Sequence, residues 1–205
     1  MDLPADLVLP LRSGEGWWYW LGGRPALDFV NTFRERWWRQ VETLVTPADL
    51  SQWTVRAGLV DEPPRFTPAL LASARELREA INTALVATLE GRAAPANALD
   101  TIDGWLVESR VPDRLVRGDN RQASLEPGYP AHPGRYALGL ISRDAAEMLG
   151  TDQRDRVRVC ASETCSARFY DRSRAGRRRW CSMEGCGNTA KARRHRARQA
   201  EASAG

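Results

Sequence analysis

Four cysteines, all in the last quarter of the chain, carry the clearest chemistry in the sequence. They form two pairs of equal spacing, Cys160-x4-Cys165 and Cys181-x4-Cys186, with fifteen residues between the pairs. Two cysteine pairs about 15–20 residues apart are a recognised zinc-binding arrangement, although the usual spacing within a pair is two residues. Four thiolates close a tetrahedral zinc site and leave no position for water. The pattern therefore predicts one structural Zn²⁺ per chain and no metal catalysis.

Three other uses of these cysteines remain open: two disulfides, an iron–sulfur cluster, or unrelated buried thiols. Disulfides are rare in the reducing cytosol. We expect a cytoplasmic protein, because residues 1–6 are acidic where a secretory leader is basic. No stretch reaches the roughly 18 consecutive apolar residues of a membrane span, so no membrane partner is expected. Zinc is therefore the favoured interpretation.

The segment around the cysteines is too poor in apolar residues to fold alone. Metal binding contributes on the order of 10–16 kcal/mol in zinc-finger peptides and can make up that deficit. Residues 157–159 and 167–171 are predicted as short strands, and Asn188 can cap a helix after the second cysteine pair, which is a treble-clef-like layout. The expected small core comprises Val157, Val159, Phe169, Tyr170, Trp180 and Met183.

Basic residues collect around this predicted knot. Residues 151–205 carry 14 basic and 6 acidic side chains, whereas residues 1–150 carry 16 basic and 20 acidic ones. The overall net charge of +4 hides this asymmetry, which predicts that the C-terminal part meets a polyanion. The candidate nucleic-acid contacts lie between and after the cysteine pairs: Arg172, Arg174, Arg177, Arg178, Arg179, Lys191, Arg193, Arg194, Arg196 and Arg198.

The predicted C-terminal helix has no Leu, Ile, Val or Phe, so it cannot be a core helix. We expect it to project from the knot and to lie along phosphates or in a groove. The alternative is a solvated basic tail that binds nothing specific. His195 is interpreted as one more polar residue of this helix rather than as a fifth metal ligand.

The first 150 residues are expected to form a helical domain with a few short strands, and residues 151–205 the finger. Helices are predicted at residues 47–57, 68–90, 97–109 and 136–149, the last ending at Gly150. Short strands are expected at residues 115–116 and 123–125. The run 26–33 fits either a buried helix or a strand. It contains Asp28 and Asn31, which are candidates for ligand contact; the favoured alternative is that they bond buried backbone or cap a helix.

These motifs together resemble the CGNR zinc-finger proteins, in which the finger follows an ABATE domain. The finger resemblance runs from Arg158 to Arg198. It includes Phe169-x-Asp171-x-Ser173, Arg179-Trp180-Cys181-Ser182-Met183 and Cys186-Gly187-Asn188-Thr189-Ala190-Lys191. The segment Leu21-Gly22-Gly23-Arg24-Pro25-Ala26-Leu27-Asp28-Phe29-Val30-Asn31-Thr32 is similar to the ABATE opening. Where the family has Cys-Gly-Asn-Arg, this chain has Thr189 in the last place, so an arginine contact at the first helical turn is absent while the metal site is untouched.

The resemblance implies a stress-induced transcription regulator with a mostly helical N-terminal domain that senses a ligand or dimerises. We therefore expect a zinc-dependent DNA-binding protein, associated with the nucleoid when bound, with a possible homodimer contact in the N-terminal domain and a possible small-molecule effector. The alternatives are an RNA-binding or a protein-docking zinc module. An enzyme is not expected, because the chain lacks a glycine-rich phosphate loop, a Gly-x-Ser-x-Gly elbow and enough histidines for metal chemistry.

Overall fold

Helices dominate the fold of the computed structural model, which describes residues 3–12, 14, 16–118 and 122–203. The helical part contains α1 (Pro25–Val30), α2 (Pro47–Arg56), α3 (Pro68–Leu89), α4 (Ala96–Leu106), a 3₁₀ turn η1 (Val107–Ser109) and α5 (Pro133–Leu149). Two antiparallel hairpins accompany it, β1 (Phe33–Arg34) with β2 (Val41–Glu42) and β3 (Arg114–Arg117) with β4 (Ala123–Glu126). The C-terminal part contains η2 (Asp152–Arg156), β5 (Val157–Val159), β6 (Arg168–Tyr170), η3 (Met183–Gly187) and α6 (Asn188–Ser203).

The starts of the helices follow from local chemistry. The Thr46 side chain accepts a hydrogen bond from the Asp49 N–H, and the Asp49 carboxylate accepts one from the Thr46 N–H, so α2 begins with a capping box. Thr67 caps α3 by accepting from the Leu70 N–H, without the reciprocal bond, and proline follows each cap. The last helix of the body, α5, begins at Pro133, three residues before the predicted start, because proline is favoured in the first helical turn.

The main core lies around α3. Its buried side chains recur at helical spacing, as Leu77, Ile81 and Leu85 do. They pack against α1, α4 and α5. Trp53 from α2 is fully buried and contacts Phe29 of α1 with ring centroids 5.3 Å apart. The run 26–33 is therefore a short helix followed by the first strand, which the periodicity alone did not decide.

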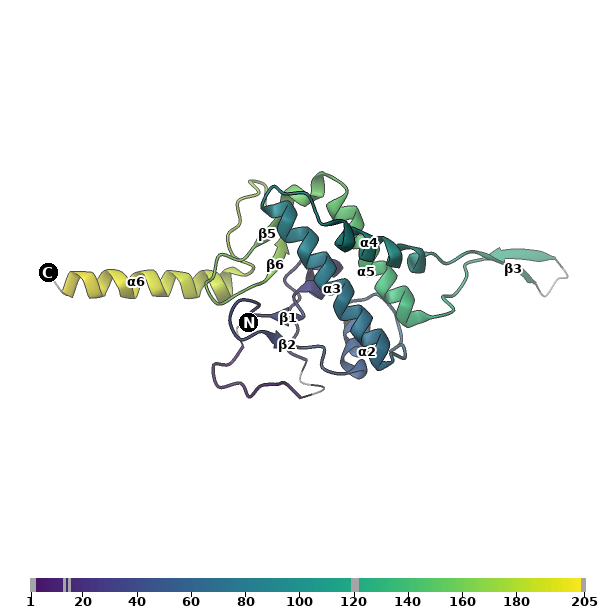
Figure 1. Cartoon of the computed structure of the whole chain (residues 1–205), viewed down its shortest axis with the longest axis horizontal. Coiled ribbons are helices and arrows are strands. Elements are labelled where there is room, and N and C mark those ends of the chain that lie inside the picture. The colour runs from purple at the N-terminus through teal and green to yellow at the C-terminus, as the bar shows by residue number, and fades with distance from the viewer. Residues whose placement is uncertain (1–2, 13, 15, 119–121, 204–205) are drawn as a thin grey trace.

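The predicted fold class, mainly helical with a few short strands and a C-terminal zinc finger, is confirmed. The β3–β4 hairpin matches the two expected strands, whereas the β1–β2 hairpin was not predicted. Figure 1 shows α6 leaving the body on one side and the β3–β4 hairpin on the other. Among the described residues, no helix is both long and apolar enough to cross a membrane.

Candidate zinc centre and nucleic-acid interface

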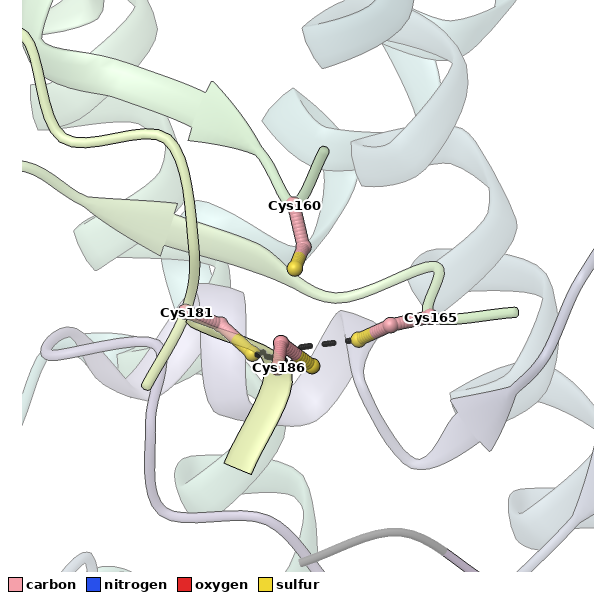
Figure 2. Close-up of side chains that lie close together, drawn as sticks. All are labelled: Cys160, Cys165, Cys181 and Cys186. Atoms are coloured by element: carbon pink, nitrogen blue, oxygen red, sulfur yellow. Dashed lines mark hydrogen bonds between the residues drawn. The ribbon is translucent and has the colours of Figure 1, made fainter. Parts of the chain in front are cut away.

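The four cysteines come together in one buried cluster. All four Sγ atoms lie within 4.8 Å of one another, and Figure 2 shows the side chains pointing toward a common centre. The Sγ atom of Cys181 lies 3.8 Å from that of Cys165 and 3.7 Å from that of Cys186. None of the four thiols is joined in a disulfide.

These separations fit a tetrahedral zinc site. With a Zn–S bond of about 2.3 Å, the edge of a regular tetrahedron of sulfur atoms is about 3.8 Å. A disulfide would require about 2.05 Å. The four Cys side chains, and the absence of a position for water in such a donor set, fit one structural Zn²⁺ held by Cys160, Cys165, Cys181 and Cys186.

The acidities of these thiols depend on one another. Hydrogen bonds from the thiols of Cys165, Cys181 and Cys186 hold the pKa of Cys160 far below its ordinary value. The pKa of Cys165 is raised, first by its hydrogen bond with Cys160. Four thiolates so close together repel strongly, and a divalent cation at their centre removes that repulsion.

Two structural elements position the cluster. Cys160 follows β5, and its N–H donates to the Ala167 carbonyl 2.9 Å away, which extends the β5–β6 hairpin. Cys186 lies in η3, immediately before α6 begins, so the metal site would fix the base of this helix. The Ser182 hydroxyl, which accepts from the Gly185 N–H, closes the turn between the second pair of cysteines.

The finger is bonded to the helical body through backbone and side-chain contacts. The Asn31 amide donates to the Arg168 carbonyl and accepts from the Arg168 N–H, both at 2.8 Å. The Tyr170 N–H donates to the Gly22 carbonyl 2.8 Å away. The finger therefore has a defined orientation on the body.

The predicted core of the finger is divided between two places. Phe169 is fully buried beside the four cysteines, but Val157 and Tyr170 pack against the main helical core. Met183 was expected in this core and is 48% exposed, which corrects that expectation. Its sulfur lies over Gly187 on the outside of the knot.

Asp28 and Asn31, the candidates for ligand contact, both bond the protein's own backbone. Asn31 is buried and makes the Arg168 pair described above. Asp28 Oδ1 accepts from the Gly22 N–H at 2.7 Å, and burial raises the pKa of its carboxyl to about 6. This is the structural role that was the favoured alternative for both residues.

The predicted nucleic-acid contacts divide into two groups. Members of the first group are exposed, and the structure shows no ion pair for them among its described residues: Arg174, Arg177, Lys191, Arg196 and Arg198. This group lies at the tip of the loop and along α6. Its charges are available to a polyanion.

Members of the second group contact the protein itself. The Arg178 guanidinium donates to the carbonyls of Trp180 and Cys181, which braces the loop against the cysteine cluster. The Arg172 guanidinium donates to the Gly23 carbonyl, 2.6 Å away. Three others surround the first turns of α6: Arg193 pairs with Glu163 at 2.9 Å, and Arg179 and Arg194 lie over the Trp180 ring.

Two features of the surface were missed from the sequence. Trp37 and Trp38 are 50% and 56% exposed in the turn between β1 and β2. A groove of about 600 Å³ lies between α3, α4 and the end of α5; Leu99, Ile102 and Leu149 are among its lining residues.

Two family comparisons match this chain. Residues 23–152 match the ABATE family, described as "putative stress-induced transcription regulator", and residues 156–199 match the CGNR zinc finger. No curated protein matches the chain. The first match covers more than half of the chain, and the second contains all four clustered cysteines. The chain therefore belongs to the ABATE family and ends in a CGNR zinc finger.

Proposed function

We propose that this protein is a zinc-dependent DNA-binding transcription regulator. One Zn²⁺ per chain holds the finger, and the exposed basic residues of the loop and of α6 contact phosphates. The observation that supports this most is the position of α6. It begins at Asn188, two residues after Cys186 of the cluster, and projects from the body (Figure 1). It is exposed at every position from 191 to 200.

The dimensions of α6 suit a DNA groove. Its 16 residues give a length of about 24 Å at about 1.5 Å per residue. The major groove of B-DNA, about 12 Å wide, admits one α-helix. Lys191, Arg194 and Arg198 recur at spacings of three and four and so share one face of the helix. That face can follow one phosphate strand while the neighbouring arginines reach the other or the base edges.

Of the ten basic residues predicted to contact nucleic acid, we expect the five exposed ones without an ion pair to contact phosphates. Arg178 and Arg172 bond backbone carbonyls, so in this proposal they hold the shape of the finger. Thr189, which replaces the family's arginine, is half-buried at the first turn of α6 and supplies no charge there. Binding strength then comes from the outer part of α6 and the loop tip.

The proposal includes a second copy of the chain. A single finger with one reading helix buries little surface on DNA, so useful specificity calls for two fingers. The dimer contact belongs to the N-terminal region, where Leu115 and Leu125 pair across the β3–β4 hairpin and are 74% and 70% exposed. An isolated two-stranded hairpin is at best marginally stable in water, and a second copy would cover its apolar side chains.

We also propose a location for the protein and a site for its regulation. A four-thiolate zinc site suits the reducing cytoplasm, where the protein would associate with the nucleoid when bound to DNA. If a small molecule regulates it, the groove beside α4 and α5 is the place we propose for that ligand. Its volume of about 600 Å³ is within the ordinary range of ligand pockets. Arg154 of this groove is in η2, which leads directly into β5 of the finger.

The test of the proposal is binding of the zinc-loaded protein to random-sequence duplex DNA, followed by fluorescence anisotropy between 50 and 200 mM salt. Each phosphate contact contributes about −0.9 to the slope of log affinity against log salt. Five exposed cations predict a slope of about −4 or steeper. Tight binding to structured RNA but not to duplex DNA would favour the RNA alternative, and no salt-dependent binding to either would favour protein docking.

A further inference from the structure

Two consecutive tryptophans are exposed to solvent in the turn between β1 and β2. We call residues 35–40 the tryptophan turn. Trp37 and Trp38 are 50% and 56% exposed, whereas Trp53 is fully buried in the same region. An aromatic side chain commonly buries about 150–250 Å², so leaving two consecutive ones half exposed forgoes a large stabilisation. Contiguous exposed apolar groups of this kind mark interaction sites.

Hydrogen bonds within the tryptophan turn define its conformation. Its first and last residues, Glu35 and Gln40, have φ values of 50° and 54°, in the left-handed region that non-glycine residues seldom adopt. The Glu35 carbonyl accepts from the N–H groups of Trp38 and Gln40, at 2.8 and 3.0 Å. The Glu35 carboxylate holds Arg39 with two hydrogen bonds of 2.6 and 2.9 Å. Strained backbone kept by such bonds is typical of functional sites.

A guanidinium group lies over each of the two rings. Arg39 Cζ is 4.8 Å from the centroid of Trp38, and Arg168 Cζ is 5.6 Å from that of Trp37. Arg168 is buried in the finger, where burial, and next the charge of Arg36, lowers its pKa to about 10. It stays cationic at neutral pH. The exposed indoles are therefore accompanied by positive charge.

The tryptophan turn touches the finger at the residue that also touches α6. Trp37 Nε1 donates to the Glu163 carbonyl at 2.9 Å, and the Glu163 carboxylate pairs with Arg193 of α6 at 2.9 Å. The Arg36 N–H adds a 3.1 Å bond to the Ser166 hydroxyl. The aromatic surface of the N-terminal region is thus continuous with the base of the basic helix.

We propose that Trp37 and Trp38 form a stacking site for an unpaired base of the nucleic acid that the finger holds. Indole faces beside arginines are the combination that binds unstacked bases with little sequence preference. A polyanion anchored on α6 would bring its bases to these rings. An apolar protein partner would instead have to bury the charged side chains of Arg39 and Arg193. This proposal rests on the proposed nucleic-acid binding and adds a preference for distorted or partly single-stranded sites.

The test compares two labelled oligonucleotides of one sequence, a fully paired duplex and the same duplex with one unpaired 2-aminopurine. The full-length zinc-loaded protein should prefer the unpaired form by about tenfold and quench its 2-aminopurine fluorescence, as base–aromatic stacking does. Trp37→Ala with Trp38→Ala should remove the preference and the quenching, with little change in affinity for the paired duplex. Trp37→Phe with Trp38→Phe should keep most of both, because a stacking face remains although the bond to Glu163 is lost.

The matched control is Tyr129→Ala, which removes an aromatic side chain that is 85% exposed but lies in the segment between β4 and α5. It should bind both oligonucleotides as the unchanged protein does. Zinc content and circular dichroism of each variant establish that it is folded. Equal affinity of the unchanged protein for both oligonucleotides, or an alanine variant that keeps the preference, would overturn this inference and leave the proposed function standing. Failure to bind either oligonucleotide would overturn both.

Discussion

Arginine has different roles in the helical region and in the finger. In the helical region, Arg78 is 3% exposed and its guanidinium pairs with Glu42 at 2.7 Å and Glu79 at 2.8 Å. In the finger, Arg177 and Arg196 are exposed, and the structure shows no carboxylate bound to them among its described residues. The difference is the presence of a carboxylate partner. Where the chain supplies a partner, arginine stabilises the fold. Where an exposed guanidinium has no partner among the described residues, it is available to an external polyanion.

The largest effect is expected from Cys181→Ser. Removing one thiolate opens the closed site, so the protein should lose its zinc and residues 157–199 should unfold. Helices α3 to α5 should persist if the chain consists of two separately folding domains, 1–150 and 151–205. Metal analysis and far-ultraviolet circular dichroism provide the measurement. Loss of all helical signal in one transition would show that the bonds between Asn31 and Arg168 make the two parts a single unit.

A smaller but still large effect is expected when a paired arginine is removed. Arg78→Met leaves Glu42 with Arg75 alone, 3.4 Å away, which should cost about 1–3 kcal/mol in the free energy of unfolding. Urea denaturation measures this value. The control is Arg135→Ala, which removes an exposed pair with Glu108 and should cost less than about 1 kcal/mol. Equal losses for the two variants would contradict the distinction between buried and exposed arginines.

The opposite result is expected for the exposed arginines of the finger. Changing Arg177, Arg196 and Arg198 to alanine should alter the stability by no more than about 0.5 kcal/mol each. The slope of log affinity against log salt on duplex DNA should become shallower by about 0.9 for each lost phosphate contact. Salt titrations of the variant and of the unchanged protein measure the difference.

The matched control for that variant removes three exposed arginines of the N-terminal region: Arg65, Arg110 and Arg114. It lowers the net charge equally, so it separates contact from overall charge. We expect its salt slope to be unchanged. If both variants weaken DNA binding to the same extent, general electrostatic attraction rather than the finger surface would account for binding.

The last prediction concerns pH. Because burial raises the pKa of Asp28 to about 6 from a model-compound value of 3.8, the folded chain binds this proton more tightly than the unfolded chain does. Its contribution to stability is therefore full below about pH 4 and is lost as the pH rises through 6. Asp28→Asn keeps the Oδ1 acceptor for Gly22 and should flatten this part of the stability profile. Thermal melts of the variant and of the unchanged protein between pH 4 and 7 measure the difference. If the two stability profiles had the same shape, Asp28 would not titrate in this range.

Local patterns were sufficient to predict much of the fold and the cluster. The caps at Thr46 and Thr67 and the regular leucine spacing of α3 are local signals, and so is the repeated spacing of the cysteines. Each of these signals depends on neighbours within a few residues. The cysteine cluster joins two pairs that are distant in the sequence, and it could be predicted because four thiolates are a specific donor set for zinc.

Long-range contacts explain what the sequence did not reveal. Asn31 bonds Arg168 across 137 residues, and no local rule indicates such a pair. The exposure of Trp37 and Trp38 depends on the left-handed backbone of Glu35 and Gln40 and on the contact with Glu163, which no local pattern indicates. Arg178 was grouped with the other basic residues of its loop, and only its bonds to two carbonyls show that it braces the finger.

The most direct test of the central claim is removal and return of zinc while DNA binding is followed. The purified protein should contain one zinc per chain and bind duplex DNA with an affinity that falls steeply with salt. A strong chelator under reducing conditions should abolish this binding, and added Zn²⁺ should restore it. Binding that survives complete loss of zinc, with the same salt slope, would contradict the account, because the basic residues would then act without the finger that holds them.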